Sequence, residues 1–146
     1  MTWISEEGLT RVDFRYLLDT NILSDFLRNP QGLVGKRLAV VGEATVCTSI
    51  VVACELRFGA KKKGSSRLEE RVDEALASLD VLPLDKESDR HYAEIRTCLS
   101  REGRPIGSND LLIAAHALAL DLILVTGNVD EFALVPGLAI ENWLAA

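Results

Sequence analysis

Three acidic residues stand where a carboxylate can take part in chemistry. Asp19 directly follows the apolar run 16–18, Glu55 interrupts a long apolar segment, and Asp110 opens another. An ionised carboxylate among apolar side chains is costly to bury without a partner. Carboxylates that converge without Lys or Arg repel one another, and a hard divalent cation is the usual remedy. The chemistry open to such a site is activation of water and of a phosphate by the bound metal ion.

Each of these acids also has a structural explanation, which the residues alone leave open. Asp19 can cap the helix that follows it. Glu55 can pair with Arg57 or lie on an exposed helix face. Asp110 comes two residues after Ser108, the expected cap of its helix, where the helix dipole favours a negative charge by about 0.5 kcal/mol. Only a common location in the fold would favour the catalytic explanation.

The elements expected around these residues bring strand ends to one edge of a sheet. Short apolar runs alternate with longer helix-like segments, which is typical of a parallel sheet covered by helices. Strands are expected at residues 16–18, 45–48, 81–84, 122–125 and 138–141, and helices at 21–28, 32–41, 49–62, 67–79, 86–101, 108–120 and 128–132. Ligands of such sheets bind beyond the carboxyl ends of the strands. Asp19, Thr48 and Thr126 are expected there.

Length and charge limit the possible functions. The chain of 146 residues suffices for one domain with a buried core, and no linker-like segment divides it. A formal net charge of −6 argues against binding of nucleic acid by a generally basic surface. A nuclease with an acidic metal site needs only a local basic rim. Candidates for this rim are Arg28, Arg57, Lys61, Lys62, Lys63, Arg101 and Arg104.

The remaining composition favours a cytoplasmic protein with no membrane association. No run approaches the ~18 apolar residues of a membrane-spanning helix, and the N-terminus lacks the layout of a signal peptide. Cys47, Cys54 and Cys98 lie in apolar segments and are odd in number, which is typical of reduced core thiols. His91 and His116 are expected to be packing or surface residues, so zinc is not indicated.

Four segments, in order along the chain, together resemble a known family. They are YLLDTNILSDFLRNP from Tyr16, TSIVVACELRFGAKK from Thr48, PIGSNDLLIAAHALAL from Pro105 and TGNVDEFALVPGLAIENW from Thr126. Each segment alone is a weak signal, but the four in this order are specific. The chain resembles PIN-domain ribonucleases, in particular the VapC-type toxins of toxin–antitoxin pairs. By this resemblance residues 15–146 form the PIN domain, and residues 1–14 are an N-terminal extension outside the match.

The resemblance implies a fold, an activity and partners. The fold is α/β, with three α/β/α layers and a mostly parallel sheet of about five strands. The activity is metal-dependent endoribonuclease cleavage of RNA phosphodiester bonds, with transfer RNA as a candidate substrate. Mg²⁺ is the implied cofactor, with Mn²⁺ as a substitute. The implied partners are a VapB-type antitoxin and a second copy of the chain in a homodimer.

The resemblance also assigns site residues. Asp19, Glu55 and Asp110 occupy the positions that hold the metal and are catalytic. The fourth acidic position of many PIN domains is Asn128 here, and Glu131 is a nearby candidate, so the resemblance leaves the fourth ligand open between them. Of the two roles that Glu131 could have, an indirect one is expected. The positions that support the metal ligands are Thr20, Asn21, Thr126, Asn128 and Glu131.

Two other classes of function compete with this one. A metal-dependent phosphatase of the haloacid-dehalogenase type also places an Asp at a strand end, but it needs a second Asp where Asn21 stands. A catalytically inert binding module explains each acid separately as a cap or a surface charge. It does not explain why several acids should gather at one sheet edge.

Overall fold

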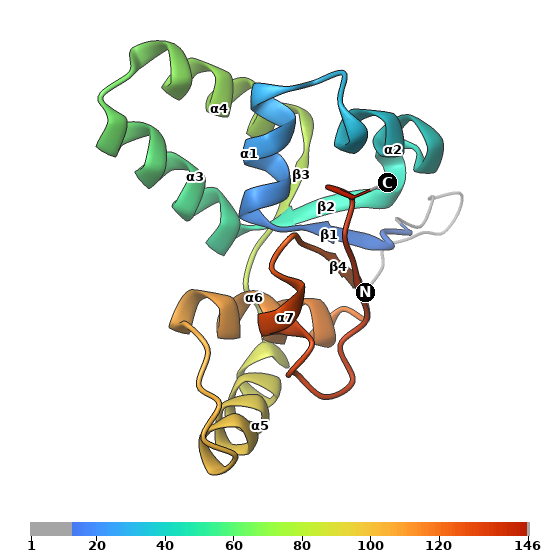
Figure 1. Ribbon diagram of the computed structural model, residues 1–146, viewed down its shortest axis with the longest axis vertical. Helices are drawn as coiled ribbons and strands as arrows, with labels where there is room; N and C mark the ends of the chain where they lie inside the picture. Colours follow the sequence, from blue (N-terminus) through green and yellow to red (C-terminus); the bar gives the residue numbers. More distant parts are fainter. Residues whose placement is uncertain (1–12, 146) are drawn as a thin grey trace.

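The computed structural model describes residues 13–145, in which helices cover both faces of a five-stranded sheet (Figure 1). The strands are β1 (Tyr16–Leu18), β2 (Val46–Ser49), β3 (Asp80–Leu82), β4 (Ile123–Val125) and β5 (Ile140–Glu141). Their order in the sheet is β3-β2-β1-β4-β5, and every neighbouring pair is parallel. The expected three-layer α/β fold with a parallel sheet is confirmed.

Seven α-helices connect and cover these strands in the described residues. They are α1 (Thr20–Arg28), α2 (Leu33–Val41), α3 (Ile50–Lys63), α4 (Ser66–Ser78), α5 (Ser88–Arg101), α6 (Ser108–Ala119) and α7 (Val129–Phe132), with a 3₁₀ turn, η1, at Glu43–Thr45. Figure 1 shows α1 to α4 on one side of the sheet and α5 to α7 on the other. Within the described residues, no helix is long and apolar enough to cross a membrane.

The middle strands are buried on both faces, and this burial fixes the position of the sheet edge at their carboxyl ends. Leu17 and Leu18 of β1 and Leu124 and Val125 of β4 are fully buried, as their continuous apolar runs require. In the register, Leu18 lies beside Val125 on one side and Thr48 on the other. The residues that follow β1, β2 and β4 therefore emerge at the same edge of the sheet.

Helix caps fix how the chain leaves this edge. Ser49 caps α3 as expected, since its hydroxyl accepts a hydrogen bond from the Val51 N–H at 3.0 Å. The prediction that Ser108 caps α6 is wrong by one residue. The carbonyl of Gly107 already accepts the N–H of Leu111 at 2.9 Å, which makes Gly107 the cap and Ser108 the first helical residue.

Two further expectations about buried residues have different outcomes. His116 is 1% exposed and packs inside the protein, which is one of the two outcomes expected for it. Cys47 is also buried, but Cys54 is exposed and Cys98 only half-buried, so the prediction of three core thiols is wrong. Cys54 is exposed because α3 turns it to solvent on the same face as Ile50 and Phe58. Residues 1–12 of the expected extension lie outside the described residues.

Candidate metal centre

Asp19 is the most buried acid of the site, with 3% of its surface exposed. Its Oδ1 accepts the N–H of Thr20 at 2.8 Å, and its Oδ2 accepts the hydroxyl of Thr126 at 2.7 Å. Burial raises the pKa of Asp19, while the hydrogen bonds from Thr126 and Thr20 lower it and the charges of Glu55 and Glu131 raise it. One oxygen of the carboxylate thus caps α1. The other is held by Thr126, the residue that follows β4.

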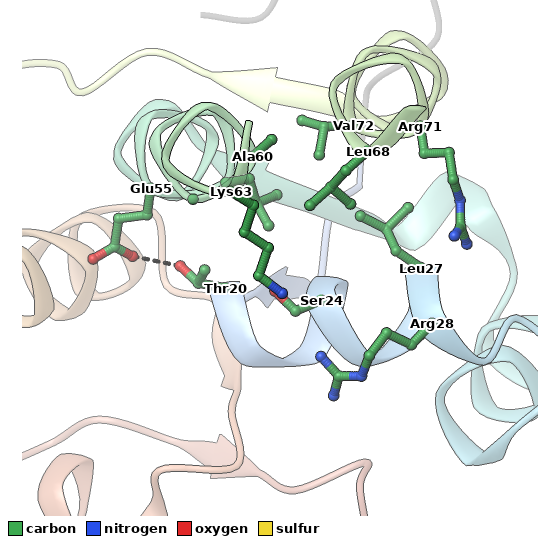
Figure 2. A pocket seen from close by; sticks show the side chains of 12 residues that line it. Thr20, Ser24, Leu27, Arg28, Glu55, Ala60, Lys63, Leu68, Arg71 and Val72 are labelled. Atoms are coloured by element: carbon green, nitrogen blue, oxygen red, sulfur yellow. Dashed lines mark hydrogen bonds between the residues drawn. The ribbon is translucent and has the colours of Figure 1, made fainter. Parts of the chain in front are cut away.

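Glu55 reaches the same edge from the second turn of α3. Its Oε1 accepts the hydroxyl of Thr20, a contact drawn as a dashed line in Figure 2, and its Oε2 accepts the Asn109 amide at 3.1 Å. The alternative in which Glu55 pairs with Arg57 is wrong, because Arg57 forms its ion pair with Asp73 of α4. Glu55 therefore faces the start of α1 and the start of α6, and it has no cationic partner among the described residues.

The pKa of Asp110 is strongly changed by its surroundings. Burial raises its pKa to about 7, helped by a hydrogen bond and repulsion from Glu131 and by the charges of Asp19 and Glu55. Glu131 is held beside it, since one oxygen of Glu131 accepts the Gly107 N–H at 3.2 Å and the other accepts the amide of Asn128. Four carboxylates from four parts of the chain thus share one electrostatic neighbourhood.

A pocket of about 620 Å³ joins these groups. Its walls include the expected residues Asp19, Thr20, Asn21, Glu55, Asp110 and Asn128, together with Ser24, Arg28, Phe58 and Asn109. Thr126 and Glu131 do not line this pocket, but they contact Asp19 and Asp110, respectively. The capping and dipole explanations hold for single residues, but they do not account for acids that line one common pocket.

The supporting residues hold the loop after β4 against α1. Asn21 accepts the N–H of Gly127 at 2.9 Å, and Thr126 Oγ1 accepts the N–H of Asn128 at 3.0 Å. A Cβ on Gly127 would lie 2.5 Å from Leu144 and 3.4 Å from Asn21. Glycine is therefore the residue that lets this loop approach α1 and place Thr126 against Asp19.

The sequence interpretation missed Asn109, whose amide holds the Glu55 carboxylate. Nothing in the sequence pattern distinguishes it, because Asn109 reaches Glu55 across 54 positions of the chain. It also missed the contact of Ser49 with His116 Nδ1 at 2.9 Å, which joins the start of α3 to α6. Both contacts depend on how α3 and α6 pack together.

The donor chemistry fits a hard divalent cation, since the pocket offers carboxylate and hydroxyl oxygens and no thiolate. In residues 13–145, no three acidic, His or Cys side chains are arranged as ligands of a single ion. The reason is that Glu55 is turned toward Thr20 and Asn109, and Asp110 is paired with Glu131. A cation bound by Asp19, Glu55 and Asp110 together would require the Glu55 and Asp110 side chains to leave these contacts.

A second cavity, of about 240 Å³, lies beside the acidic pocket between α1, α3 and α4 (Figure 2). Its lining is apolar at Leu27, Leu56, Leu68 and Val72 and basic at Arg28, Lys63 and Arg71. Thr20, Ser24, Arg28 and Glu55 line both cavities. An elongated ligand can therefore cover the apolar cavity and reach the acids at the same time.

Comparison with known proteins yields one family and a set of close relatives. The family model for the PIN domain matches residues 16–138. The chain is 35% identical over 130 residues to ribonuclease VapC2 of Rickettsia felis, covering 88% of this chain and 97% of the relative. It is 37% identical over 133 residues to the tRNA(fMet)-specific endonuclease VapC of Shigella flexneri, covering 88% and 98%.

Solved structures give the same picture. The crystal structure of VapBC2 from Rickettsia felis, bound to a DNA fragment from its promoter, aligns with a TM-score of 0.83 at 34% identity. That alignment covers 89% of this chain and 99% of the other. The structure of DNA-bound VapBC from Salmonella typhimurium aligns with a TM-score of 0.81 at 33% identity, covering 89% and 98%.

Proposed function

This chain is a VapC-type member of the PIN-domain family, and on that premise we propose that it is the ribonuclease toxin of a toxin–antitoxin pair, cleaving RNA through a divalent metal held by Asp19, Glu55 and Asp110. The observation that carries the proposal is the state of the Asp110 carboxyl. Its pKa is raised to about 7 by burial and by three neighbouring acids. Acids gathered at such a cost are typical of a functional site.

The two alternative functions, a phosphatase and an inert binding module, are not supported by the arrangement of these acids. The phosphatase alternative needs a second acid at Asn21, but that side chain is engaged in holding the Gly127 N–H. An inert binding module leaves the shared pocket of Asp19, Glu55 and Asp110 unexplained.

We assign each residue a role in this chemistry. When bound, Mg²⁺, or Mn²⁺ in its place, would supply positive charge to neutralise the scissile phosphate and to make water more acidic. Asp19, Glu55 and Asp110 hold the metal. Thr126 keeps the Asp19 carboxylate oriented, and Glu131 acts on Asp110 without being a ligand. The supporting residues Thr20, Asn21 and Asn128 hold Glu55 and the loop after β4 in place.

The proposed substrate is a structured RNA, with transfer RNA as the first candidate. A relative at 37% identity is named for specificity toward tRNA(fMet). Cytoplasmic location follows from this substrate and is part of the same proposal. Sequencing of RNA ends after brief induction in bacteria would identify the cleaved molecule and position.

The proposed partner is a VapB-type antitoxin whose basic side chain enters the acidic pocket near Asp19. The adjacent apolar cavity, lined by Leu27, Leu56 and Leu68, suits the apolar face of an amphipathic helix. Solved relatives are VapBC complexes. A homodimer of the toxin belongs to the same proposal. Co-expression with the neighbouring reading frame should relieve growth arrest and give a co-purifying complex, and persistent toxicity without a complex would contradict this partner.

A direct test of the function uses purified protein and labelled RNA. Cleavage should require Mg²⁺ or Mn²⁺, stop on addition of EDTA, and be absent in Asp19→Asn. Metal-independent cleavage, or equal cleavage by Asp19→Asn, would show that the acidic pocket is not the site of the reaction.

A further inference from the structure

Phe58 is an exposed aromatic residue in the wall of the acidic pocket. It exposes 65% of its surface, although burial of a Phe side chain is ordinarily favourable. It lines the same pocket as Asp19, Glu55 and Asp110. Residues three apart on a helix are neighbours on its surface, so Glu55 and Phe58 open onto the pocket from adjacent turns of α3.

One cation lies over this ring, and another lines the same pocket. The Lys62 ammonium lies 6.0 Å from the centre of the Phe58 ring. Arg28 of α1 lines the pocket as well, and its side chain is 71% exposed. The ion pair of Arg28 with Asp25 is 3.7 Å long and exposed, so it holds the guanidinium only weakly. Lys62 forms no ion pair within residues 13–145, so both cations can contact an anionic ligand.

A flat aromatic face beside two cations and a phosphate-binding metal site matches the chemistry of a nucleotide. Aromatic side chains bind unpaired bases by stacking, and neighbouring cations follow the phosphates. Bases inside a duplex have no free face to offer. Resting on the function proposed above, we propose that Phe58 stacks on the base next to the scissile phosphate, with Arg28 and Lys62 on flanking phosphates, so the substrate segment is unpaired RNA.

A second copy of the chain is the competing occupant of this face. Ile50 and Cys54 are also exposed on α3, two turns and one turn before Phe58, respectively. An apolar stripe of this kind can pack against another protein. Ile50 and Cys54 do not line the acidic pocket, whereas Phe58 does. The position of Phe58 among acids and cations favours a nucleotide.

The test compares variants of Phe58 in the Asp19→Asn background, where RNA stays intact. The probe is a single-stranded RNA oligonucleotide carrying 2-aminopurine, whose fluorescence falls when the base stacks. Phe58→Leu should weaken binding roughly 5- to 150-fold and remove the fluorescence change, as the known strength of base stacking implies. Phe58→Tyr should keep both. Val40→Ala, a matched control at an exposed apolar residue of α2, should change neither.

Different results would overturn the proposal. Equal binding and equal quenching by Phe58→Leu would exclude stacking, and so would an equal loss of affinity for a fully paired hairpin. A shift of Phe58→Leu from dimer to monomer in size-exclusion chromatography, with RNA affinity unchanged, would assign the residue to an interface between copies.

Cleavage by the parent protein is measured in parallel. If the parent cleaves RNA and Phe58→Leu binds normally, only the stacking proposal fails, whereas absence of cleavage and binding by the parent defeats the proposed function itself.

Discussion

At Asp19 and Asp110, structural and chemical roles coexist in the same side chain. Asp19 caps α1 through Oδ1 while Oδ2 faces Thr126, and Asp110 lies in the first turn of α6, where the helix dipole favours a negative charge. An amide at either position keeps the shape and an acceptor oxygen but removes the charge. The two roles can therefore be separated by Asp→Asn substitutions.

Asp110→Asn should abolish RNA cleavage while making the metal-free protein more stable at pH 8. The pKa of Asp110 in the folded protein is about 7, above its ordinary value of 3.8, so the folded state holds a proton that the unfolded chain releases. The stability of the parent thus falls as pH rises from about 4 to about 7. The variant lacks this loss, and its melting temperature at pH 8 should be higher by roughly 2–4 °C per kcal/mol of repulsion removed.

Thermal unfolding in EDTA at pH 4, 6 and 8 measures this effect. The advantage of Asp110→Asn over the parent should grow with pH, while Glu74→Gln, at an exposed acid of α4 outside the pocket, should show no such trend. A variant that melts earlier than the parent at pH 8 and still cleaves RNA would identify Asp110 as a structural cap.

Glu131→Gln should damage cleavage less than Glu55→Gln. Glu131 touches the Gly107 N–H and the Asn128 amide and influences Asp110, so it acts through another residue. Losing a residue of this kind typically costs about 10- to 100-fold in metal affinity or activity. Removing the charge of the proposed ligand Glu55 should cost more. Cleavage rates over a Mg²⁺ titration decide the order, and a larger loss in Glu131→Gln would make Glu131 the metal ligand.

At the scale of elements, one buried contact connects the two helices that carry Glu55 and Asp110. Ser49 caps α3 and also meets His116 of α6, with both side chains almost fully buried. Burial lowers the pKa of His116, which favours the neutral imidazole in this contact. The beginning of α3 is thereby tied to α6, and the two acids are set relative to one another.

Ser49→Ala should therefore lower both stability and cleavage. Loss of a helix cap costs about 1 kcal/mol, and the lost contact with His116 adds to this. Ser65→Ala is the matched control, because Ser65 caps α4 through the Leu68 N–H and α4 carries no acid of the pocket. Melting temperatures and cleavage rates, measured well below both transitions, should show a loss of stability in each variant but a loss of activity in Ser49→Ala only. Equal losses of activity would mean that the cap does not position Glu55.

The sequence predicted the elements better than the contacts between them. The apolar runs gave β1 and β4 within a residue, because strands buried on both faces leave a continuous apolar signal. The cap of α6 was missed, since Gly107 and Ser108 are both acceptable caps and only the hydrogen bond to Leu111 distinguishes them. The exposure of Cys54 was missed because α3 is apolar on most sides, so its composition does not show which face is buried.

In the candidate site, too, the positions of residues on elements were predictable, whereas the contacts between side chains were not. The location of Asp19 at a strand end followed from the pattern, whereas the bond between Glu55 and Asn109 and the pairing of Asp110 with Glu131 join helices that pack only in the folded protein. Side-chain partners that are 21 and 54 positions apart leave no local signal in a single sequence.

At the scale of the whole molecule, metal binding should be visible as a gain in global stability. A ligand that binds only the folded state, at 100 times its Kd, stabilises it by about 2.7 kcal/mol. Mg²⁺ or Mn²⁺ should raise the melting temperature of the parent, and should raise that of Asp19→Asn much less because one buried ligand charge is gone. Differential scanning fluorimetry with and without EDTA measures the difference. Equal shifts in the two proteins would indicate nonspecific ion effects.

The strand order also governs when during synthesis the site can exist. β1 emerges early but occupies the centre of the sheet, and one of its two neighbours, β4, follows more than a hundred residues later. Asp19 is synthesised 107 residues before its partner Thr126, which corresponds to about 5–20 s at ordinary rates of translation. A nascent chain therefore contains Asp19 and Glu55 before β4 and Thr126 exist, and the complete pocket can form only after this later part of the sheet has been synthesised.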